Sequence, residues 1–497
     1  MSLKKKVVDG IRWNFAGKLG SQIVSIIAVI VLSRLLAPEI FGTIAIAAIF
    51  TGLANILISF GIKPIIVQTE NLTDEKTDTF FYLYLSIAII SIIILNSFGF
   101  LIAEYYAVKG LQTVLFIMSL SIPLNTYNTV QIALLSRDMK FKDLSIRKFI
   151  SQILALVGVV ILSYFTKPYI ALAFQSVILS LGSILFLQFV AKWNPRLRFN
   201  FNLVRHEISF GKVLFLNNLA AYLSTQVDNL FIGKTYGEFE FGLYQRGYIF
   251  IMLPTKFIAD GLGNVLNPFY AKIKEEKKRI GKYYMYSYRI SSILLGMLLL
   301  PVIIEPEGFV LLIFGEQWIE MSEYLRIFAI CGYLQGLNSL VSPILHALAE
   351  KKLLMWDIVF KRLFLVIAVL VGLQYGIIYV IYARLISDLF NLIVSGHQMF
   401  KSIQVTYSDQ IMMTLRSTIA STIVFLVLFI AAYFLKNVVD SDVIRFTCVS
   451  LISVLTTYLY IVLVKPTFIR EILSQGFVSN QMVGYAERLK LITPNKN

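Results

Sequence analysis

The chain has 497 residues, of which 57% are hydrophobic and 15% are charged, and its mean hydropathy is +0.75. A soluble fold of this length cannot bury so much apolar surface, so the composition excludes a soluble protein. The formal net charge of +16 does not indicate nucleic acid as a partner, because the cations are spread over many short loops without a nucleic-acid-binding motif.

Uninterrupted apolar runs of about 20 residues predict transmembrane helices, because a helix satisfies its own backbone hydrogen bonds in lipid. We therefore expect an all-α integral membrane protein with about 14 transmembrane helices. In chain order, the predicted helices are 11–34, 40–63, 79–103, 113–135, 147–165, 169–191, 209–233, 241–270, 285–304, 321–347, 354–373, 375–399, 414–435 and 443–464.

The first twelve predicted helices form two pseudo-symmetric six-helix lobes, residues 1–191 and 209–399, which a cytoplasmic linker at 192–208 joins. Two additional helices lie in 400–464, and residues 465–497 are expected to form a cytoplasmic tail that either lies on the membrane surface or is solvated.

A duplicated segment supports the two lobes. Residues 33–50 (SRLLAPEIFGTIAIAAIF) and 233–250 (GKTYGEFEFGLYQRGYIF) share a cation at the second position, a short acidic turn and a Phe-Gly pair, at 41–42 and 241–242. Helical membrane proteins with two related halves commonly bind their substrate between them, so the duplication predicts a transporter.

The distribution of cations predicts the orientation in the membrane, because lysine and arginine accumulate in short cytoplasmic loops. The loop after the predicted fourth helix contains Arg137, Lys140, Lys142, Arg147 and Lys148, and the loops after the sixth and eighth helices are similarly basic. The loop after the ninth helix is acidic, with Glu305, Glu307, Glu316 and Glu320. This alternation predicts that both termini are cytoplasmic.

Seven charged residues fall inside predicted transmembrane helices. At roughly 3 kcal/mol each, they would oppose insertion by about 20 kcal/mol if they faced lipid, so we expect them to face a wet interior. They are Lys18, Asp228, Arg246, Lys256, Asp260, Arg384 and Asp388.

Two pairs of these charges are spaced four residues apart and therefore share a helix face: Lys256 with Asp260, and Arg384 with Asp388. One interpretation is that each pair only neutralises itself and holds the helices together. The other is that the cations bind an anionic substrate and the acids couple an ion.

The remaining charges are read in the same two ways. Asp228 and Arg246 lie near the outer ends of adjacent predicted helices. In one interpretation they form a structural clasp; in the other, Asp228 couples an ion and Arg246 binds the substrate. Lys18 has no acid at comparable depth in the first six predicted helices. The substrate-binding candidates are thus Lys18, Arg246, Lys256 and Arg384, and the surplus of cations predicts an anionic cargo.

Prolines predict bends in three helices. Pro254 lies in the middle of the predicted eighth helix, and Pro123 and Pro343 occupy the fourth and tenth helices, which correspond in the two lobes. Because proline removes a backbone donor, we expect bends that either open a cavity alternately to each side or are static.

No pattern typical of a catalytic, metal or cofactor site is found. The three histidines are far apart, and neither a CxxC nor an HExxH motif occurs. The sequence therefore predicts a transporter with no cofactor, not an enzyme.

Three stretches carry a resemblance to a known family: WNFAGKLGSQIVSIIAVIVLSRLLAPEIFG (13–42), VDNLFIGKTYGEFEFGLYQRGYIFIMLP (227–254) and GNVLNPFYAKI (263–273). They resemble bacterial polysaccharide transporters of the multidrug/oligosaccharidyl-lipid/polysaccharide superfamily, particularly Wzx-type and teichuronic-acid-exporter-like flippases. The resemblance spans about residues 5–400.

This resemblance implies two six-helix lobes around a cationic cavity, in the bacterial cytoplasmic (inner) membrane. It implies a flippase for an undecaprenyl-pyrophosphate-linked oligosaccharide, used to assemble O-antigen, capsule, exopolysaccharide or teichuronic acid. The implied partners are membrane lipid, a polysaccharide polymerase and a chain-length regulator.

Three alternatives stay open from the sequence. A cation-coupled multidrug antiporter of the same superfamily normally relies on membrane acids in its amino-terminal lobe, which this sequence lacks. A peptidoglycan lipid flippase shares the helix count and the basic cavity. A membrane-bound glycosyltransferase or polymerase would normally carry a carboxylate-rich loop, whereas the long loops here are basic.

Overall fold

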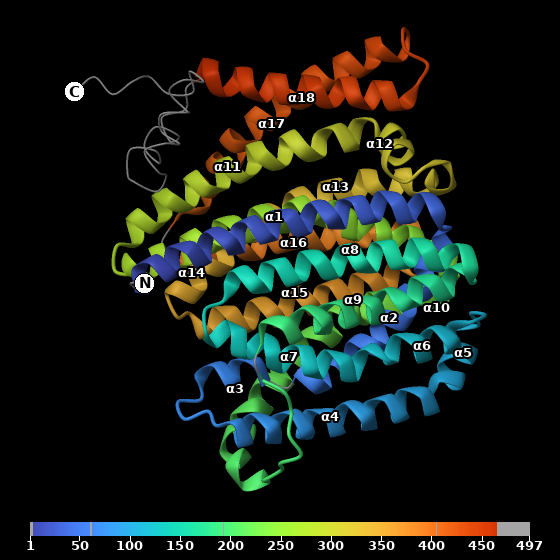
Figure 1. Ribbon diagram of the computed structural model, residues 1–497. Helices are drawn as coiled ribbons and strands as arrows, with labels where there is room; N and C mark the ends of the chain where they lie inside the picture. Colours follow the sequence, from blue (N-terminus) through green and yellow to red (C-terminus); the bar gives the residue numbers. More distant parts are fainter. Residues whose placement is uncertain (1–2, 60–61, 192, 404, 465–497) are drawn as a thin grey trace. The chain divides into compact units, whose positions relative to one another are not determined.

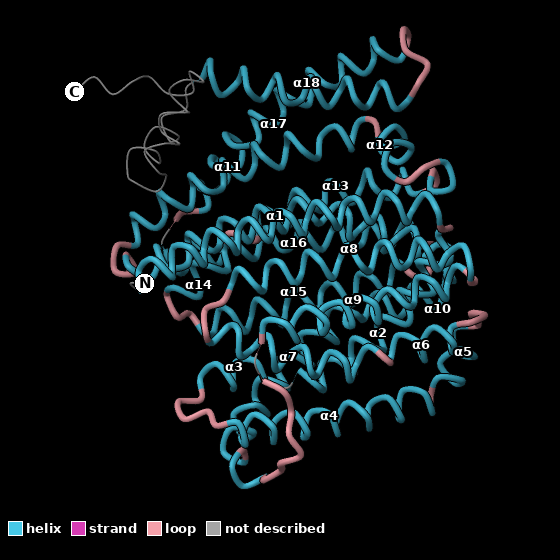
Figure 2. The backbone as a smooth tube through the Cα atoms, viewed as in Figure 1, coloured by secondary structure: helices cyan, strands magenta, loops and turns pink. Residues whose placement is uncertain are grey.

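The computed structural model describes residues 3–59, 62–191, 193–403 and 405–464 (Figure 1). Within these ranges every regular element is helical, and no strand is present (Figure 2). The predicted all-α fold class is confirmed. The predicted tail at 465–497 lies outside the described residues.

The chain divides into two compact units, residues 1–245 and 246–497, whereas the predicted lobe boundaries remain a prediction. The helices of the first unit are α1 (Leu3–Leu35), α2 (Pro38–Ser59), α3 (Ile62–Gln68), α4 (Asp74–Ser97), α5 (Gly99–Tyr106), α6 (Leu111–Ser119), α7 (Ser121–Arg137), α8 (Phe141–Phe165), α9 (Pro168–Val190), the 3-10 turn η1 (Phe201–Leu203) and the beginning of α10 (Arg205–Lys272). The second unit holds the rest of α10, then α11 (Lys277–Ile304), α12 (Pro306–Ile313), η2 (Glu316–Trp318), α13 (Met321–Asn338), α14 (Val341–Ala347), α15 (Lys351–Gly372), α16 (Ile377–Ile403), α17 (Tyr407–Lys436) and α18 (Asp442–Val464).

Each of the fourteen predicted segments overlaps a helix of the structure. Ten helical stretches of the described chain are long and apolar enough to cross a membrane. One of them, 225–272, includes parts of two predicted helices, so this result is compatible with fourteen spans without confirming that number. The chain is a multi-pass membrane protein.

Helix breaks lie at two of the three places where prolines predicted bends, Pro123 and Pro343, whereas α10 continues through Pro254 without a break. Helix α6 ends at Ser119 before α7 begins, and α13 ends at Asn338 before α14 begins. Proline lacks the amide donor, and its ring clashes with the carbonyl four residues earlier, at position 119 or 339. The break in each case therefore falls one turn before the proline.

In the first unit, the two copies of the duplicated segment pack against each other. A Cβ atom added to Gly42 would lie 1.8 Å from the carbonyl oxygen of Glu238, and one added to Gly242 would lie 2.1 Å from that of Pro38. Only glycine allows this approach of two backbones. Gly237, with φ of 78°, interrupts α10 between the predicted seventh and eighth helices.

Side chains hold the beginning of α10 to the same unit. The Tyr222 hydroxyl donates to the carbonyl oxygen of Ile49 at 2.7 Å, and the Tyr106 hydroxyl donates to that of Leu230 at 3.2 Å. The α1 helix packs along α8, which in turn packs along α9 (Figure 1).

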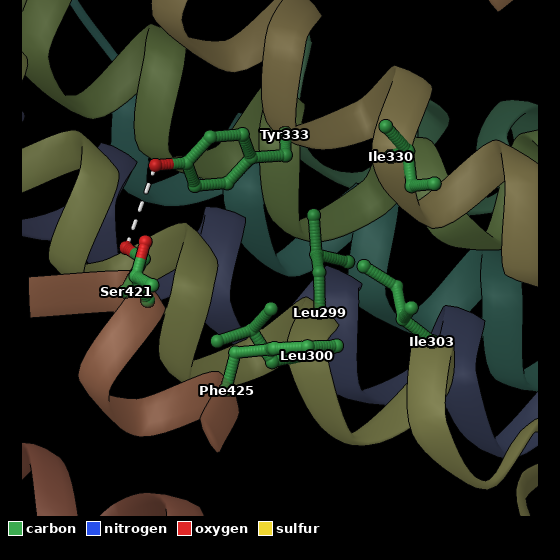
Figure 3. A pocket seen from close by; sticks show the side chains of 8 residues that line it. Leu299, Leu300, Ile303, Ile330, Tyr333, Ser421 and Phe425 are labelled. Carbon is green, nitrogen blue, oxygen red and sulfur yellow. Dashed lines mark hydrogen bonds between the residues drawn. The ribbon is translucent and has the colours of Figure 1, made fainter. Parts of the chain in front are cut away.

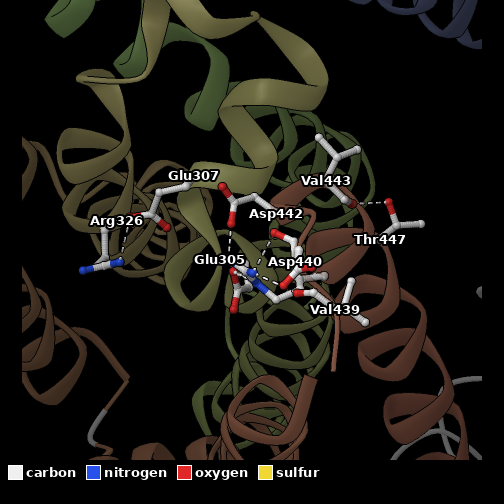
Figure 4. Close-up of polar contacts among 9 residues, drawn as sticks. Glu305, Glu307, Arg326, Val439, Asp440, Asp442, Val443 and Thr447 are labelled. Atoms are coloured by element: carbon white, nitrogen blue, oxygen red, sulfur yellow. Dashed lines mark hydrogen bonds and ion pairs between the residues drawn. The ribbon is translucent and has the colours of Figure 1, made fainter. Parts of the chain in front are cut away.

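In the second unit, α11 packs against α13, α17 and α18. The Arg445 side chain fastens the first turn of α18 to the end of α11: its Nε lies 3.5 Å from Oε2 of Glu305, and its Nη1 donates to the carbonyl oxygen of Val439 at 3.0 Å (Figure 4). Its Nη2 also pairs with Asp442. This cluster fixes the α17–α18 hairpin, which has no counterpart in the predicted lobes, to the rest of the second unit.

Candidate functional site

Arg384 and Asp388 are buried together on α16, with exposed fractions of 9% and 5%. They lie one turn apart, and the positive charge of Arg384 acts on the Asp388 carboxylate. The spacing predicted that both residues share one face of their helix, and this face of α16 is buried.

Residues from two further helices complete this buried cluster. The Arg384 guanidinium carbon lies 3.9 Å from the centre of the Tyr248 ring on α10. The Tyr248 hydroxyl donates to Oε1 of Gln335 on α13 at 3.3 Å, and Nε2 of Gln335 donates to Oδ2 of Asp388 at 2.9 Å. Nδ2 of Asn338 donates to the Asp388 carbonyl oxygen at 3.4 Å. We call these five residues the Arg384 cluster.

The Arg384 cluster is electrically neutral and fixes three helices to one another. A desolvated cation over a tyrosine ring contributes about 2 kcal/mol, and a buried acid and base stabilise only when each is paired. An anionic ligand of Arg384 would therefore compete with Asp388 and Tyr248. This geometry favours the structural interpretation of the pair, while a role of Arg384 in substrate binding stays a prediction.

Sequence reasoning missed Gln335 and Asn338. Both are uncharged, and their spacing of three residues on α13 was the available signal, because it places two amides on one face of an apolar helix. Tyr248, the third uncharged member of the cluster, stacks on Arg384.

Lys256 and Asp260 are placed differently from the Arg384 cluster. Both side chains are exposed on α10, one turn apart. The neighbouring Thr255 is buried and donates to the carbonyl oxygen of Gly332 on α13 at 3.1 Å. The helix thus buries Thr255 and leaves the Lys256 side chain exposed.

The predicted pair of Asp228 and Arg246 falls on the two sides of the unit boundary and stays a prediction. Asp228 is 5% exposed, and Arg246 is half-buried. Lys18 is half-buried on α1, and its charge acts on Lys148 of α8.

The prediction that Arg147 and Lys148 belong to a loop is wrong, while their cytoplasmic position stays a prediction. Helix α8 begins at Phe141, so both residues lie in its second turn, and Nη1 of Arg147 donates to Oγ of Ser183 on α9 at 2.8 Å. The apolar run of this helix begins only after Lys148, so the sequence pattern placed the helix start at 147, six residues too late.

An apolar pocket of about 220 Å³ lies between α11, α13 and α17 (Figure 3). Aliphatic side chains such as Leu299 and Ile330 line it, and its polar edge is formed by the hydroxyls of Tyr333 and Ser421, which lie 3.4 Å apart. None of the predicted site residues lines this pocket. Its lining suits an apolar group and not a phosphate.

No group of three or more metal-ligating side chains is found in the part of the chain that the structure describes.

Three curated relatives match most of the chain. The Lipopolysaccharide biosynthesis protein WzxC of Escherichia coli (strain K12) is 24% identical and aligns over 81% of this chain and 82% of its own length. The Succinoglycan biosynthesis transport protein ExoT of Rhizobium meliloti (strain 1021) is 24% identical over 71% of both chains. The Teichuronic acid biosynthesis protein TuaB of Bacillus subtilis (strain 168) is 21% identical over 72% of this chain and 74% of its own.

Solved structures share the fold. The Lipid II flippase MurJ in an inward closed conformation superimposes with a TM-score of 0.72 and 16% identity, over 92% of this chain and 99% of that one. A multidrug resistance MATE family transporter of the MOP superfamily, in an inward-facing conformation, gives a TM-score of 0.57 at 12% identity, over 78% and 96%.

The predicted resemblance is confirmed by these comparisons and by a family profile. The profile described as "Polysaccharide biosynthesis protein" matches residues 31–323, which is more than half of the chain and includes both copies of the duplicated segment. The chain belongs to the polysaccharide biosynthesis protein family.

Proposed function

We propose that this protein is a flippase that moves a lipid-linked oligosaccharide across the bacterial cytoplasmic membrane for assembly of a surface polysaccharide. The observation that carries the proposal is the family match over residues 31–323 of a chain with many membrane-spanning helices. Relatives named as biosynthesis and transport proteins for lipopolysaccharide, succinoglycan and teichuronic acid support it. The carrier is proposed to be undecaprenyl pyrophosphate.

The physical task is to carry sugars and a diphosphate past an apolar barrier. Hydroxyl and phosphate groups lose water hydrogen bonds in lipid, so a flippase must replace those contacts inside the protein. Lys256 is proposed to bind the diphosphate, because its side chain is exposed on α10 and charge-assisted hydrogen bonds to phosphate are strong. Lys18, Arg246 and Arg384 are the further cations proposed for this role.

Alternating access is proposed to use the breaks in the helices. The α6–α7 and α13–α14 breaks leave short helical segments that can reorient without disrupting long helices. A polysaccharide polymerase and a chain-length regulator in the same membrane are the proposed partners, since the flipped unit must then be polymerised.

The function is tested by transport in proteoliposomes. A fluorescent undecaprenyl-pyrophosphoryl oligosaccharide placed on one leaflet should become accessible on the other only when the protein is present. Lys256→Ala should slow this movement at least about tenfold, equivalent to about 1.4 kcal/mol. The control is Lys272→Ala, which removes an exposed lysine from the last turn of the same helix and should leave the rate unchanged.

A multidrug antiporter is the second candidate, because a MATE transporter shares the fold at a TM-score of 0.57. If the lipid-linked oligosaccharide does not move while a cationic dye is exported under a proton or sodium gradient, the drug antiporter replaces the flippase.

Asp260 is proposed to couple transport to an ion, because its carboxylate is exposed beside Lys256. Asp260→Asn should leave binding of the lipid-linked oligosaccharide intact and abolish the dependence of the transport rate on a proton or sodium gradient. A variant with the gradient dependence of the wild type would remove Asp260 from this role.

A further inference from the structure

A cavity of about 450 Å³ lies within the first unit, between α2, α7, α8 and α9. Its volume is in the range of about 300–1,000 Å³ that is typical of small-molecule sites. Amides and hydroxyls make up most of the lining, together with two cations, Arg147 and Lys148. None of the described residues that line it is acidic.

The two cations of this cavity lack a compensating acid in its lining. Nη1 of Arg147 is held by Ser183 at 2.8 Å, whereas its buried Nε finds no hydrogen-bond acceptor in the described chain. The Lys148 side chain is exposed, and the charges of Arg147 and Lys18 both repel its ammonium. Adjacent like charges in partly desolvated surroundings are unfavourable unless an anion binds between them.

The amides of the cavity offer acceptors for hydroxyl groups. Nδ2 of Asn128 donates to the carbonyl oxygen of Ser180 at 3.1 Å, and Nε2 of Gln152 donates to Oγ of Ser25 at 3.2 Å. These bonds leave the oxygens Oδ1 of Asn128 and Oε1 of Gln152, both buried and without a donor in the described part of the chain. An amide oxygen of this kind accepts a hydrogen bond from a ligand hydroxyl.

We infer that this cavity binds an acidic sugar, a hexuronate unit of the cargo, with its carboxylate on Arg147 and Lys148 and its hydroxyls on Asn128 and Gln152. The inference rests on the proposed function and adds to it the chemical class of the saccharide. A phosphodiester would satisfy the cations but leave both amide oxygens without donors, because it has no hydroxyl group. A neutral hexose would donate to the amide oxygens but leave the two cations without an anion. Only a group that is both anionic and hydroxylated satisfies the whole lining.

Binding is measured with radiolabelled D-glucuronate on the full-length protein in lipid nanodiscs, in competition with D-glucose and with inorganic phosphate. Glucuronate should bind, and each competitor should displace it at least about tenfold less well than unlabelled glucuronate, or about 1.4 kcal/mol. Equal displacement by phosphate would overturn the inference in favour of a simple anion site. Equal displacement by glucose, or no glucuronate binding, would also overturn it.

Two substitutions test the assigned contacts. Lys148→Gln should weaken glucuronate binding at least tenfold (about 1.4 kcal/mol), whereas Lys142→Gln, on the same helix and outside the cavity lining, should not change it. Gln152→Glu has nearly the same shape and adds a negative charge, so it should weaken glucuronate binding and strengthen binding of the cationic sugar D-glucosamine. Unchanged selectivity in Gln152→Glu would contradict the assignment.

Transport with two cargoes separates this inference from the proposed function. Arg147→Gln should slow the flipping of a uronate-containing lipid-linked oligosaccharide much more than that of a neutral one, and movement of the neutral cargo also shows that the variant is folded. If the wild type moves neither cargo, the proposed function fails. If the variant moves both as fast as the wild type does, only the inference fails.

Discussion

At the scale of single residues, the two pairs of charges predicted inside the membrane lie in different environments. Arg384 and Asp388 are buried and compensated within the Arg384 cluster, whereas Lys256 and Asp260 are exposed on α10. The same spacing of four residues therefore occurs once in a buried pair and once in an exposed pair. A buried pair is expected to stabilise the fold, whereas an exposed pair is expected to contribute little to it.

The Arg384 cluster predicts a non-additive effect on stability. Arg384→Met should lower the free energy of unfolding by about 3 kcal/mol, because Asp388 is left as a buried charge without its cation, and Asp388→Leu should have a similar effect. The double variant should lose much less than the sum, since no unpaired charge remains. Thermal denaturation in detergent measures all three, and additive losses would contradict a compensated pair.

At the scale of helices, close backbone contact explains why the duplicated segments contain glycine. Gly42 and Gly242 let α2 approach α10 so closely that no side chain fits between them. Contacts of small residues between helices are a main source of packing energy in membranes, where the hydrophobic effect does not bring helices together. The two copies of the duplicated segment are therefore also the two sides of one close helix contact.

Gly42→Ala should destabilise the first unit by about 1–3 kcal/mol, because its methyl group must displace the Glu238 carbonyl. The matched control is Gly261→Ala on α10, where nothing lies within 4 Å of the added atom. There the substitution should be neutral or stabilising by roughly 0.5–1 kcal/mol, since alanine favours the helix. Equal melting temperatures for the two variants would argue against the close contact.

The anchor of α18 predicts a dependence of stability on pH. Burial raises the pKa of Glu305 above its ordinary value of 4.5, and this outweighs the lowering by Arg445. The folded protein therefore keeps this proton to a higher pH than the unfolded chain does. The resulting stabilisation is fully present below pH 4.5 and is lost as the pH rises through the folded pKa.

Comparing Glu305→Gln with the wild type isolates this effect. The melting temperature of the wild type should fall relative to that of the variant as the pH increases above 4.5. Asp440→Asn, which alters an exposed side chain of the same turn, serves as the control and should follow the wild type. A constant difference between wild type and Glu305→Gln at all pH values would exclude Glu305 as the titrating group.

At the scale of the whole molecule, the arrangement of charge predicts one orientation in the membrane. The segment 272–282, from the end of α10 into the first turns of α11, is basic, and the segment 305–320 after α11 is acidic, so the first should be cytoplasmic and the second external. The predicted cytoplasmic position of both termini depends on the same rule.

Cysteine labelling tests this orientation. In a background with Cys331→Ala and Cys448→Ala, a membrane-impermeant maleimide should label Glu316→Cys in intact cells. It should label Lys274→Cys only after the membrane is permeabilised, because that exposed position is predicted to be cytoplasmic. The reverse pattern would invert the topology and place both termini outside.

The membrane class, the helix positions and the breaks at Pro123, Pro343 and near Gly237 could be predicted from the sequence alone. These features are local, because each helix in lipid must satisfy its own backbone hydrogen bonds and proline or glycine interrupts it at a defined place. The resemblance to polysaccharide transporters was likewise present in short stretches of sequence.

Only the tertiary structure decided which membrane charges are compensated and which are accessible. In the structure, Gln335 donates to Asp388 and Tyr248 lies against Arg384. Arg147, which was expected in a loop, lies in a helix and donates to Ser183. The rotation of an almost entirely apolar helix about its axis leaves little trace in its sequence. It is set by the packing of neighbouring helices, and this packing determines which polar side chains meet.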